Sequence, residues 1–169
     1  MPLSKIQAES MNLADTYAFT GTVSGAGGGK IGQIISATHS TQFQTSSSTR
    51  AATGLTASIT PSASSSKILV LMTMAVSINR ANAEQYLQFA LQRGGSDIWD
   101  TVSSQPWGVY MGGTNHVHLK GQINLNYVDS PSTTNATTYS ITGAANGGGT
   151  ASFNALNIPS MMQLLEVLA

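Results

Sequence analysis

The chain has 169 residues, of which only 8% are charged, against about 25% in ordinary soluble proteins. Its seven basic and seven acidic residues cancel, so no basic surface is available for phosphates, and nucleic acid is excluded as a partner. The absence of cysteine excludes disulfides and thiolate metal sites. A surface so poor in charge suits a protein that buries much of it in a permanent assembly.

Residues 1–29 differ in composition from the rest and are expected to form a short extended N-terminal arm. The arm ends in a glycine-rich joint, Gly25–Gly29, and has too few apolar residues to bury a core of its own. This joint is not a phosphate loop, because Ser24 stands at the first glycine position and Ile31 follows the lysine. We expect the arm to anchor the protein to a larger particle through its apolar side chains, Ile6, Met11, Leu13, Tyr17 and Phe19.

Residues 30–169 are expected to form a single β-sandwich domain. Short runs with alternating apolar residues follow one another at regular spacing, and no helical pattern of useful length occurs after residue 29. The expected strands lie around residues 31–39, 43, 55–59, 67–78, 87–91, 98–102, 116–128, 139–141, 153 and 161–168, with a turn at Arg93–Asp97. This pattern predicts an all-β protein, most simply an antiparallel jelly roll.

The longest apolar run, Lys67–Ile78, is predicted to be a central strand covered on both faces. About 18 apolar residues are needed to cross a bilayer, so no membrane insertion is expected. The wholly apolar face should fill the sandwich; it comprises Ile68, Val70, Met72, Met74 and Val76. The opposite face, with Leu69, Leu71 and Thr73, should then lie toward a neighbouring subunit.

Candidate chemical groups are few. His116 and His118 lie two residues apart on one strand face, a spacing that can place two imidazoles on a metal or simply two solvated or interface histidines. The carboxylates that could serve a glycan hydrolase are Glu84, Asp97, Asp100 and Asp129, but Asp97 and Asp100 bracket a hairpin tip, where turn formation is the simpler role. We therefore expect no enzymatic activity and no cofactor.

Three aromatic residues are open to two interpretations. A platform for sugars could be formed by Trp99, Trp107 and Tyr110, because the faces of aromatic side chains stack well against sugar rings. The same residues could instead serve as core or trimer contacts. A carbohydrate-binding module is therefore kept as an alternative function.

Several segments resemble small virion proteins and fibre tips of tailed bacteriophages. The resemblance is carried by MPLSKIQ and NLADTYAFTGTVSG near the N-terminus and by Gly29–Ser40, Gly54–Met72, Tyr127–Ile141 and Met161–Ala169. It covers residues 29–169, with 79–126 free to vary. It implies a trimeric jelly roll of the tumour-necrosis-factor-like kind without enzymatic activity. The long shaft of a typical tail fibre is missing from this chain, which leaves both tail and capsid as locations.

Together these features predict a non-enzymatic virion structural protein on the exterior of the tail or capsid. A homotrimeric tail-fibre-type appendage is favoured, with other phage virion proteins as partners, and a capsid decoration protein that stabilises the head shell is the alternative. In the fibre form, loops Arg93–Asp97 and Pro106–Asn115 at a free end would contact a host surface glycan or protein. The expected contact residues are Arg93, Asp97, Trp107 and Tyr110.

Overall fold

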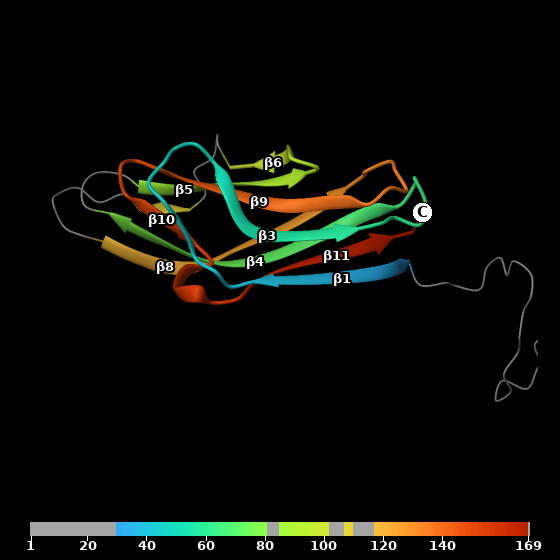
Figure 1. Cartoon of the computed structure of the whole chain (residues 1–169), viewed down its shortest axis with the longest axis horizontal. Helices are drawn as coiled ribbons and strands as arrows, with labels where there is room; N and C mark the ends of the chain where they lie inside the picture. Colours follow the sequence, from blue (N-terminus) through green and yellow to red (C-terminus); the bar gives the residue numbers. More distant parts are fainter. Residues whose placement is uncertain (1–29, 81–84, 102–106, 110–116, 169) are drawn as a thin grey trace, which may run out of the picture.

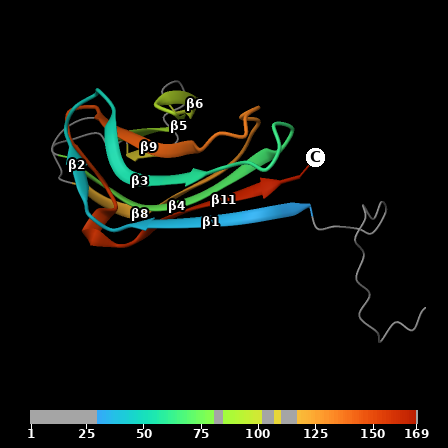
Figure 2. The ribbon, with the colours of Figure 1, turned by 45° about the vertical axis from the view of Figure 1, so that its right-hand side comes forward.

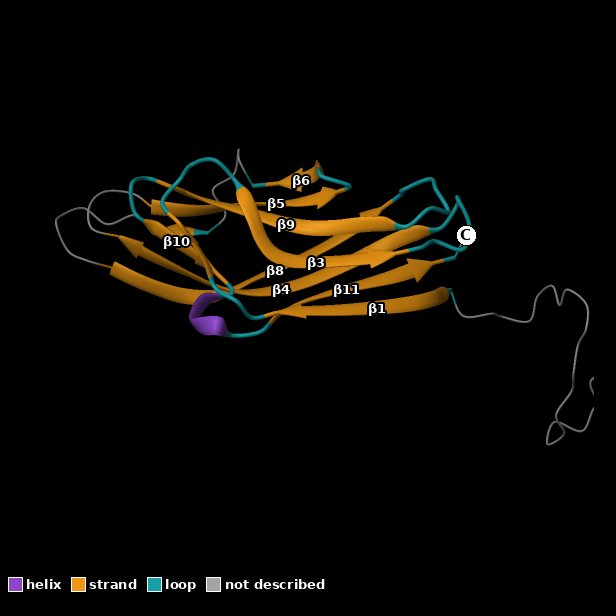
Figure 3. Cartoon of the chain, in the orientation of Figure 1, coloured by secondary structure: helices purple, strands orange, loops and turns teal. Residues whose placement is uncertain are grey.

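The structure, a computed structural model, describes residues 30–80, 85–101, 107–109 and 117–168. The predicted all-β class is confirmed, because the strands in these ranges form two antiparallel sheets packed as a jelly-roll-type sandwich (Figures 1 and 3). Some predicted site residues lie outside the described part of the chain: Ile6, Met11, Leu13, Tyr17, Phe19, Glu84, Tyr110 and His116.

Sheet A forms the lower layer in Figure 1 and has β4 at its centre. Its strands are β1 (Ile31–His39), β11 (Ser160–Val167), β4 (Lys67–Arg80), β8 (Val117–Asp129), β10 (Thr150–Phe153) and β2 (Phe43–Thr45). β8 pairs along the whole of β4, while β11 and then β10 occupy its other side. The first and last strands, β1 and β11, lie side by side, as the blue and red ribbons show (Figure 2).

Sheet B forms the upper layer and contains β3 (Ala51–Ile59), β9 (Thr137–Asn146), β5 (Gln85–Arg93), β6 (Ser96–Asp100) and β7 (Gly108–Val109). The turn between β5 and β6 is tighter than predicted, because the left-handed φ angles of Gly94 and Gly95, 56° and 86°, complete it with two residues. Arg93 and Asp97 therefore belong to strands and not to the loop.

Arg93 and Trp107, one residue from each predicted contact loop, do not lie at the same end of the molecule. Arg93 ends β5, whereas the carbonyl of Trp107 accepts a hydrogen bond from the amide of Leu87, near the start of β5, at 3.0 Å. Arg93 also bonds Asp129, which pairs with Ile68 at the end of sheet A from which the chain enters β1. The expectation of one common contact end is thus wrong for Arg93 and Trp107.

The core is assembled as the alternation of β4 predicts. Its inward residues are at most 2% exposed: Ile68, Val70, Met72, Met74, Val76 and Ile78. Sheet B contributes Leu87, Leu91 and Ile141 from the opposite side. Close approach of the sheets also requires Gly143, because a Cβ there would lie 2.2 Å from Cζ of the buried Phe153. The sandwich core therefore covers the inward face of β4, and the outward face needs a separate explanation.

Two buried carboxylates join the layers near the Lys67 end of β4. Glu166 of β11 accepts hydrogen bonds from the amide and hydroxyl of Ser62 at 2.6 and 2.7 Å and from Gln33 Nε2 at 2.7 Å. These bonds lower the pKa of Glu166 to about 2, the Ser62 hydroxyl contributing most. The carboxylate thus ties β1, β11 and the loop after β3 together.

The second carboxylate, Asp129 on β8, links the two sheets. It accepts hydrogen bonds from the hydroxyl of Tyr139 on β9 at 2.7 Å and from Arg93 Nη1 at 2.9 Å. Burial and the bond to Asp129 raise the pKa of the Tyr139 phenol above its usual range. Arg93 is therefore bound within the protein, in an ion pair with a carboxylate that is 7% exposed.

Candidate assembly surface

The outer face of sheet A carries a row of apolar side chains across four strands. Strand register aligns Ile34 of β1 with Leu165 of β11, Leu69 of β4 and Val128 of β8. Ile34 and Val128 are 56% and 55% exposed, while Leu69 and Leu165 are partly buried between them. We call these four residues the apolar row. An exposed apolar surface that is continuous across a sheet marks an interaction site.

Two polar rows follow the apolar row along the same face. One aligns Ser36, Gln163, Leu71 and Asn126, and the next aligns Thr38, Met161, Thr73 and Asn124. The Thr73 hydroxyl donates to Asn124 Oδ1 at 2.7 Å, so neutral hydrogen-bonding groups here are held in fixed positions. A hollow of about 330 Å³ lies between β4, β8 and β11, with Met161 at its wall. This part of the face can accept another protein without burying a charge.

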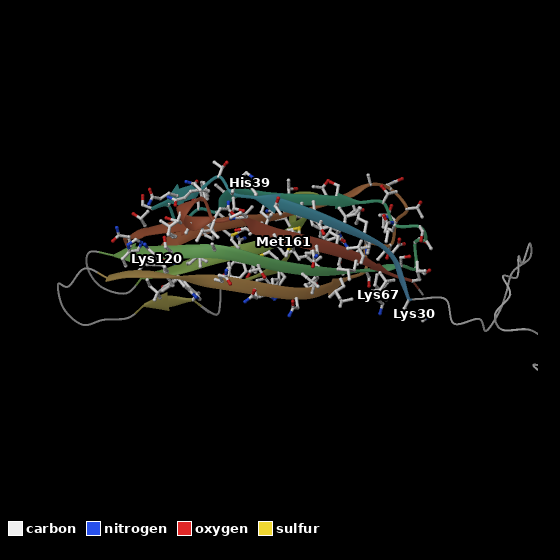
Figure 4. The ribbon with its side chains drawn as sticks, turned by 90° about the horizontal axis from the view of Figure 1, so that it is seen from below. Lys30, His39, Lys67, Lys120 and Met161 are labelled. Carbon is white, nitrogen blue, oxygen red and sulfur yellow. The ribbon has the colours of Figure 1, made fainter. Side chains whose placement is uncertain are left out.

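Charges on this face lie at its two ends. Figure 4 shows Lys30 and Lys67 at one end, Lys120 at the other and Met161 between them. Of the acidic residues in the described ranges, Glu166 and Asp129 are buried, and Asp97 and Asp100 belong to sheet B. The central area is therefore free of ionic groups, and only its ends are cationic.

A short segment after β10 adds a second apolar feature. The turn η2 (Ala155–Asn157) and Ile158 border Ala75 and Gly121, enclosing a groove of about 290 Å³. Leu156 is 58% exposed although its φ of 60° is strained for a leucine. Asn154 fixes this segment by donating to the carbonyls of Thr41 and Thr53 at 3.0 and 2.8 Å. Leu156 is thus a large apolar side chain that stands in solvent on a fixed segment, as a docking surface requires.

The predicted interface residues lie on this face. Leu69, Leu71 and Thr73 point away from the core and are partly buried in the single chain. Their part in a trimer stays a prediction. Sequence reasoning missed Ile34, Val128 and Leu165, because each was treated as a strand residue without a partner across the sheet. The period of two places Val128 on the same side of β8 as polar residues such as Asn126. Only the strand register shows that Val128 lies beside Leu69 and so extends an apolar surface.

The remaining candidate residues do not form a chemical site in the described ranges. Asp97 forms an ion pair with Arg50, and Asp100 lies 3.7 Å from the same guanidinium group. Asp129 is paired with Arg93. His118 is exposed on β8, and the described residues include no group of three metal-binding side chains. The part of the chain that the structure describes also has no helix long and apolar enough to cross a membrane.

Comparisons with known proteins add little. No family model and no curated protein matches the chain. Among solved structures, a chain of infectious bursal disease virus Gx strain matches with 14% identity and a TM-score of 0.38, and a chain of the VP2 subviral particle of infectious bursal disease virus matches with 14% identity and a TM-score of 0.40. Each match covers 81% of this chain but only 38% and 37% of the viral chains, so this chain spans little more than a third of their length. Likeness at this level carries no argument about function.

Proposed function

We propose that the protein is a non-enzymatic structural protein of a tailed-phage virion and assembles as a homotrimer through the outer face of sheet A. One observation carries this proposal. Among the described residues, six of the seven exposed large apolar side chains belong to this face or to the η2 segment against it: Ile31, Ile34, Val128, Leu156, Ile158 and Met161. The seventh, Leu119, lies on β8.

A closed ring of subunits accounts for this asymmetry between faces. Three copies with sheet A turned toward a common axis would bury the apolar row of each copy against its neighbours. The neutral amides and hydroxyls of the polar rows would form hydrogen bonds between subunits, and the lysines would stay at the ends. Ionic contacts would contribute little, as the 8% charged content requires.

A tail-fibre-type appendage is the favoured form of the proposal, and a capsid decoration protein is its alternative. The resemblance of the N-terminal segments to phage fibre proteins supports the fibre form. In either form residues 1–29 would anchor the trimer to other virion proteins. Because Lys30 enters β1 at the Arg93 end of the sandwich, the end nearer Trp107 would face outward.

The oligomeric part is tested by placing one acidic residue on each outer face. Leu71→Asp should give a folded protein that elutes as a monomer, because an unpaired carboxylate in an apolar interface costs several kcal/mol. The matched control is Ser58→Asp on the exposed face of sheet B, which should stay trimeric. Mass from light scattering and the circular dichroism melting curve would be measured together. A wild-type monomer at micromolar concentration, or a trimeric Leu71→Asp, would contradict the proposal.

The virion part is tested by deleting residues 2–28. The truncated protein should fold and form trimers but no longer join particles. Electron microscopy of particles carrying the full chain would then distinguish tail from shell. Assembly of the truncated protein onto particles would show that the arm is not the anchor.

A further inference from the structure

A groove opens between the two sheets on the side where β8 and β6 lie. It has a volume of about 360 Å³ and is lined by Phe89, Trp99, Trp107, Gln122, Ile123 and Asn124. Ile123 is 5% exposed and belongs to the core, so it forms the floor. The volume lies within the range of about 300–1,000 Å³ that is usual for small-ligand sites.

Both indoles in the groove are held by neighbours. Trp99 packs on Phe89 with ring centroids 5.3 Å apart and planes at 50°. The carbonyl of Trp107 accepts the Leu87 amide hydrogen bond, and its ring lies against Gly121, where an added Cβ would be 3.0 Å from Cζ2. The two aromatic surfaces are thus positioned before any ligand arrives, which lowers the entropic cost of binding.

The polar groups around the groove are neutral. β8 pairs with β4 on one side and with no described strand on the other, so the peptide groups of this edge are open to the groove. Gln122 and Asn124 border the groove from this edge of β8, but their side chains point to the outer face of sheet A, where Asn124 accepts the Thr73 hydrogen bond, so only their peptide groups can serve the groove. None of the lining residues is charged. Such groups can donate to and accept from hydroxyls, but they cannot neutralise an ionic ligand.

We propose that this groove binds one or two units of a neutral saccharide. The C–H face of a pyranose ring would stack on an indole, and its hydroxyls would bond the peptide groups at the free edge of β8. A second copy of this chain is the less fitting occupant, because both indoles are recessed, whereas the large apolar side chains exposed for protein contact lie mostly on the outer face of sheet A. The site does not depend on the oligomeric state or on the place of the protein in a virion.

The test uses the full-length protein and a set of neutral oligosaccharides: cellohexaose, maltohexaose, mannohexaose and an N-acetylglucosamine hexamer. Tryptophan fluorescence and titration calorimetry would measure binding. At least one sugar should bind saturably, and a sulfated heparin hexasaccharide should not bind. Trp107→Ala should weaken binding at least tenfold, a loss of about 1.4 kcal/mol. The more conservative Trp107→Phe should retain part of it.

Two further variants separate binding from structure. Gln122→Ala changes an exposed side chain on the outer face of sheet A and should leave sugar binding and the melting temperature unchanged. Leu156→Ala, which removes an exposed apolar group outside the groove, should leave sugar binding unchanged. The proposal is overturned if no neutral sugar binds at millimolar concentration. It is also overturned if Trp107→Ala dissociates the oligomer while leaving sugar binding intact, because the groove would then be a contact between subunits.

Discussion

The outer faces of the two sheets differ although both belong to one weakly charged chain. Sheet A carries the apolar row and rows of neutral amides, whereas sheet B carries hydroxyls and side-chain ion pairs. On sheet B the Ser58 and Thr138 hydroxyls bond each other at 2.7 Å, and Arg50 pairs with Asp97. None of the large exposed apolar residues in the described ranges lies on sheet B.

The outer face of sheet B shows how a chain with little charge can still present a hydrated surface. Cross-strand hydroxyl pairs satisfy each other and still accept water, so sheet B needs few ionic groups. Sheet A has no comparable protection at the apolar row and is therefore the face that should be covered.

The largest effect should follow from placing a charge on the other side of β4. Val70 is completely buried, next in sequence to the outward-facing Leu71. Val70→Asp should abolish folding, because a buried unpaired carboxylate costs several kcal/mol and most domains are stable by only about 5–15 kcal/mol. Loss of the circular dichroism melting transition would be the readout. A folded Val70→Asp protein would mean that β4 has been assigned the wrong inward face.

A smaller effect is expected from trimming the apolar row. The double variant Ile34→Ser, Val128→Ser removes exposed apolar groups and should leave the single chain folded. Each lost contact should weaken association by about 1 kcal/mol or more, so the concentration for half-dissociation should rise at least tenfold. Sedimentation at a series of concentrations measures this rise, and Thr138→Ala on sheet B serves as the matched control. Equal effects of the two changes would remove the distinction between the faces.

Acid should weaken the fold through Glu166. Its pKa is about 2 in the folded chain and 4.5 ordinarily, so its contribution is complete above pH 4.5 and is lost as the pH falls from 4.5 toward 2. The melting temperature should drop across this interval. In Glu166→Gln it should already be lower at pH 7 and should change less between pH 4.5 and 2, which thermal melts at several pH values would show. A variant that keeps the wild-type pH profile would assign acid sensitivity to another group.

The smallest effect should come from the ion pair on sheet B. Asp97→Asn breaks the pair with Arg50 but keeps an oxygen that can accept from Gln92 Nε2. Because both side chains are partly exposed, we expect a loss below about 1 kcal/mol in chemical unfolding and no change in oligomeric mass. The proposed trimer should likewise persist in about 1 M sodium chloride, since salt screens charges but not apolar burial. Dissociation by salt would point to an ionic interface.

Sequence patterns predicted what depends on local alternation. The period of two along Lys67–Ile78 identified both the buried side of β4 and the outward position of Leu69 and Leu71. The abundance of short strands and turns predicted the all-β sandwich. These features follow from residues near one another in sequence, where side-chain direction is fixed by backbone geometry.

Features that depend on strand register could not be predicted in the same way. Glu166 resembles an ordinary polar residue in MMQLLEVLA, and only the fold places it beside Ser62 and Gln33. The grouping of Arg93, Asp129 and Tyr139 likewise arises from three strands. The Trp99 and Trp107 rings were recognised as a candidate platform, but their contacts with Phe89 and Gly121 come from tertiary packing.

The pairing of β1 with β11 has a consequence for biosynthesis. Gln33 and Glu166 bond each other across a separation of 133 residues, so β1 must wait for nearly all of the domain to leave the ribosome before it finds its partner. Contacts between such distant segments make folding slow. The backbone of β1 stays without its strand partner during that time. Sheet A should therefore be completed only after synthesis of β11, and not while the chain is still being made.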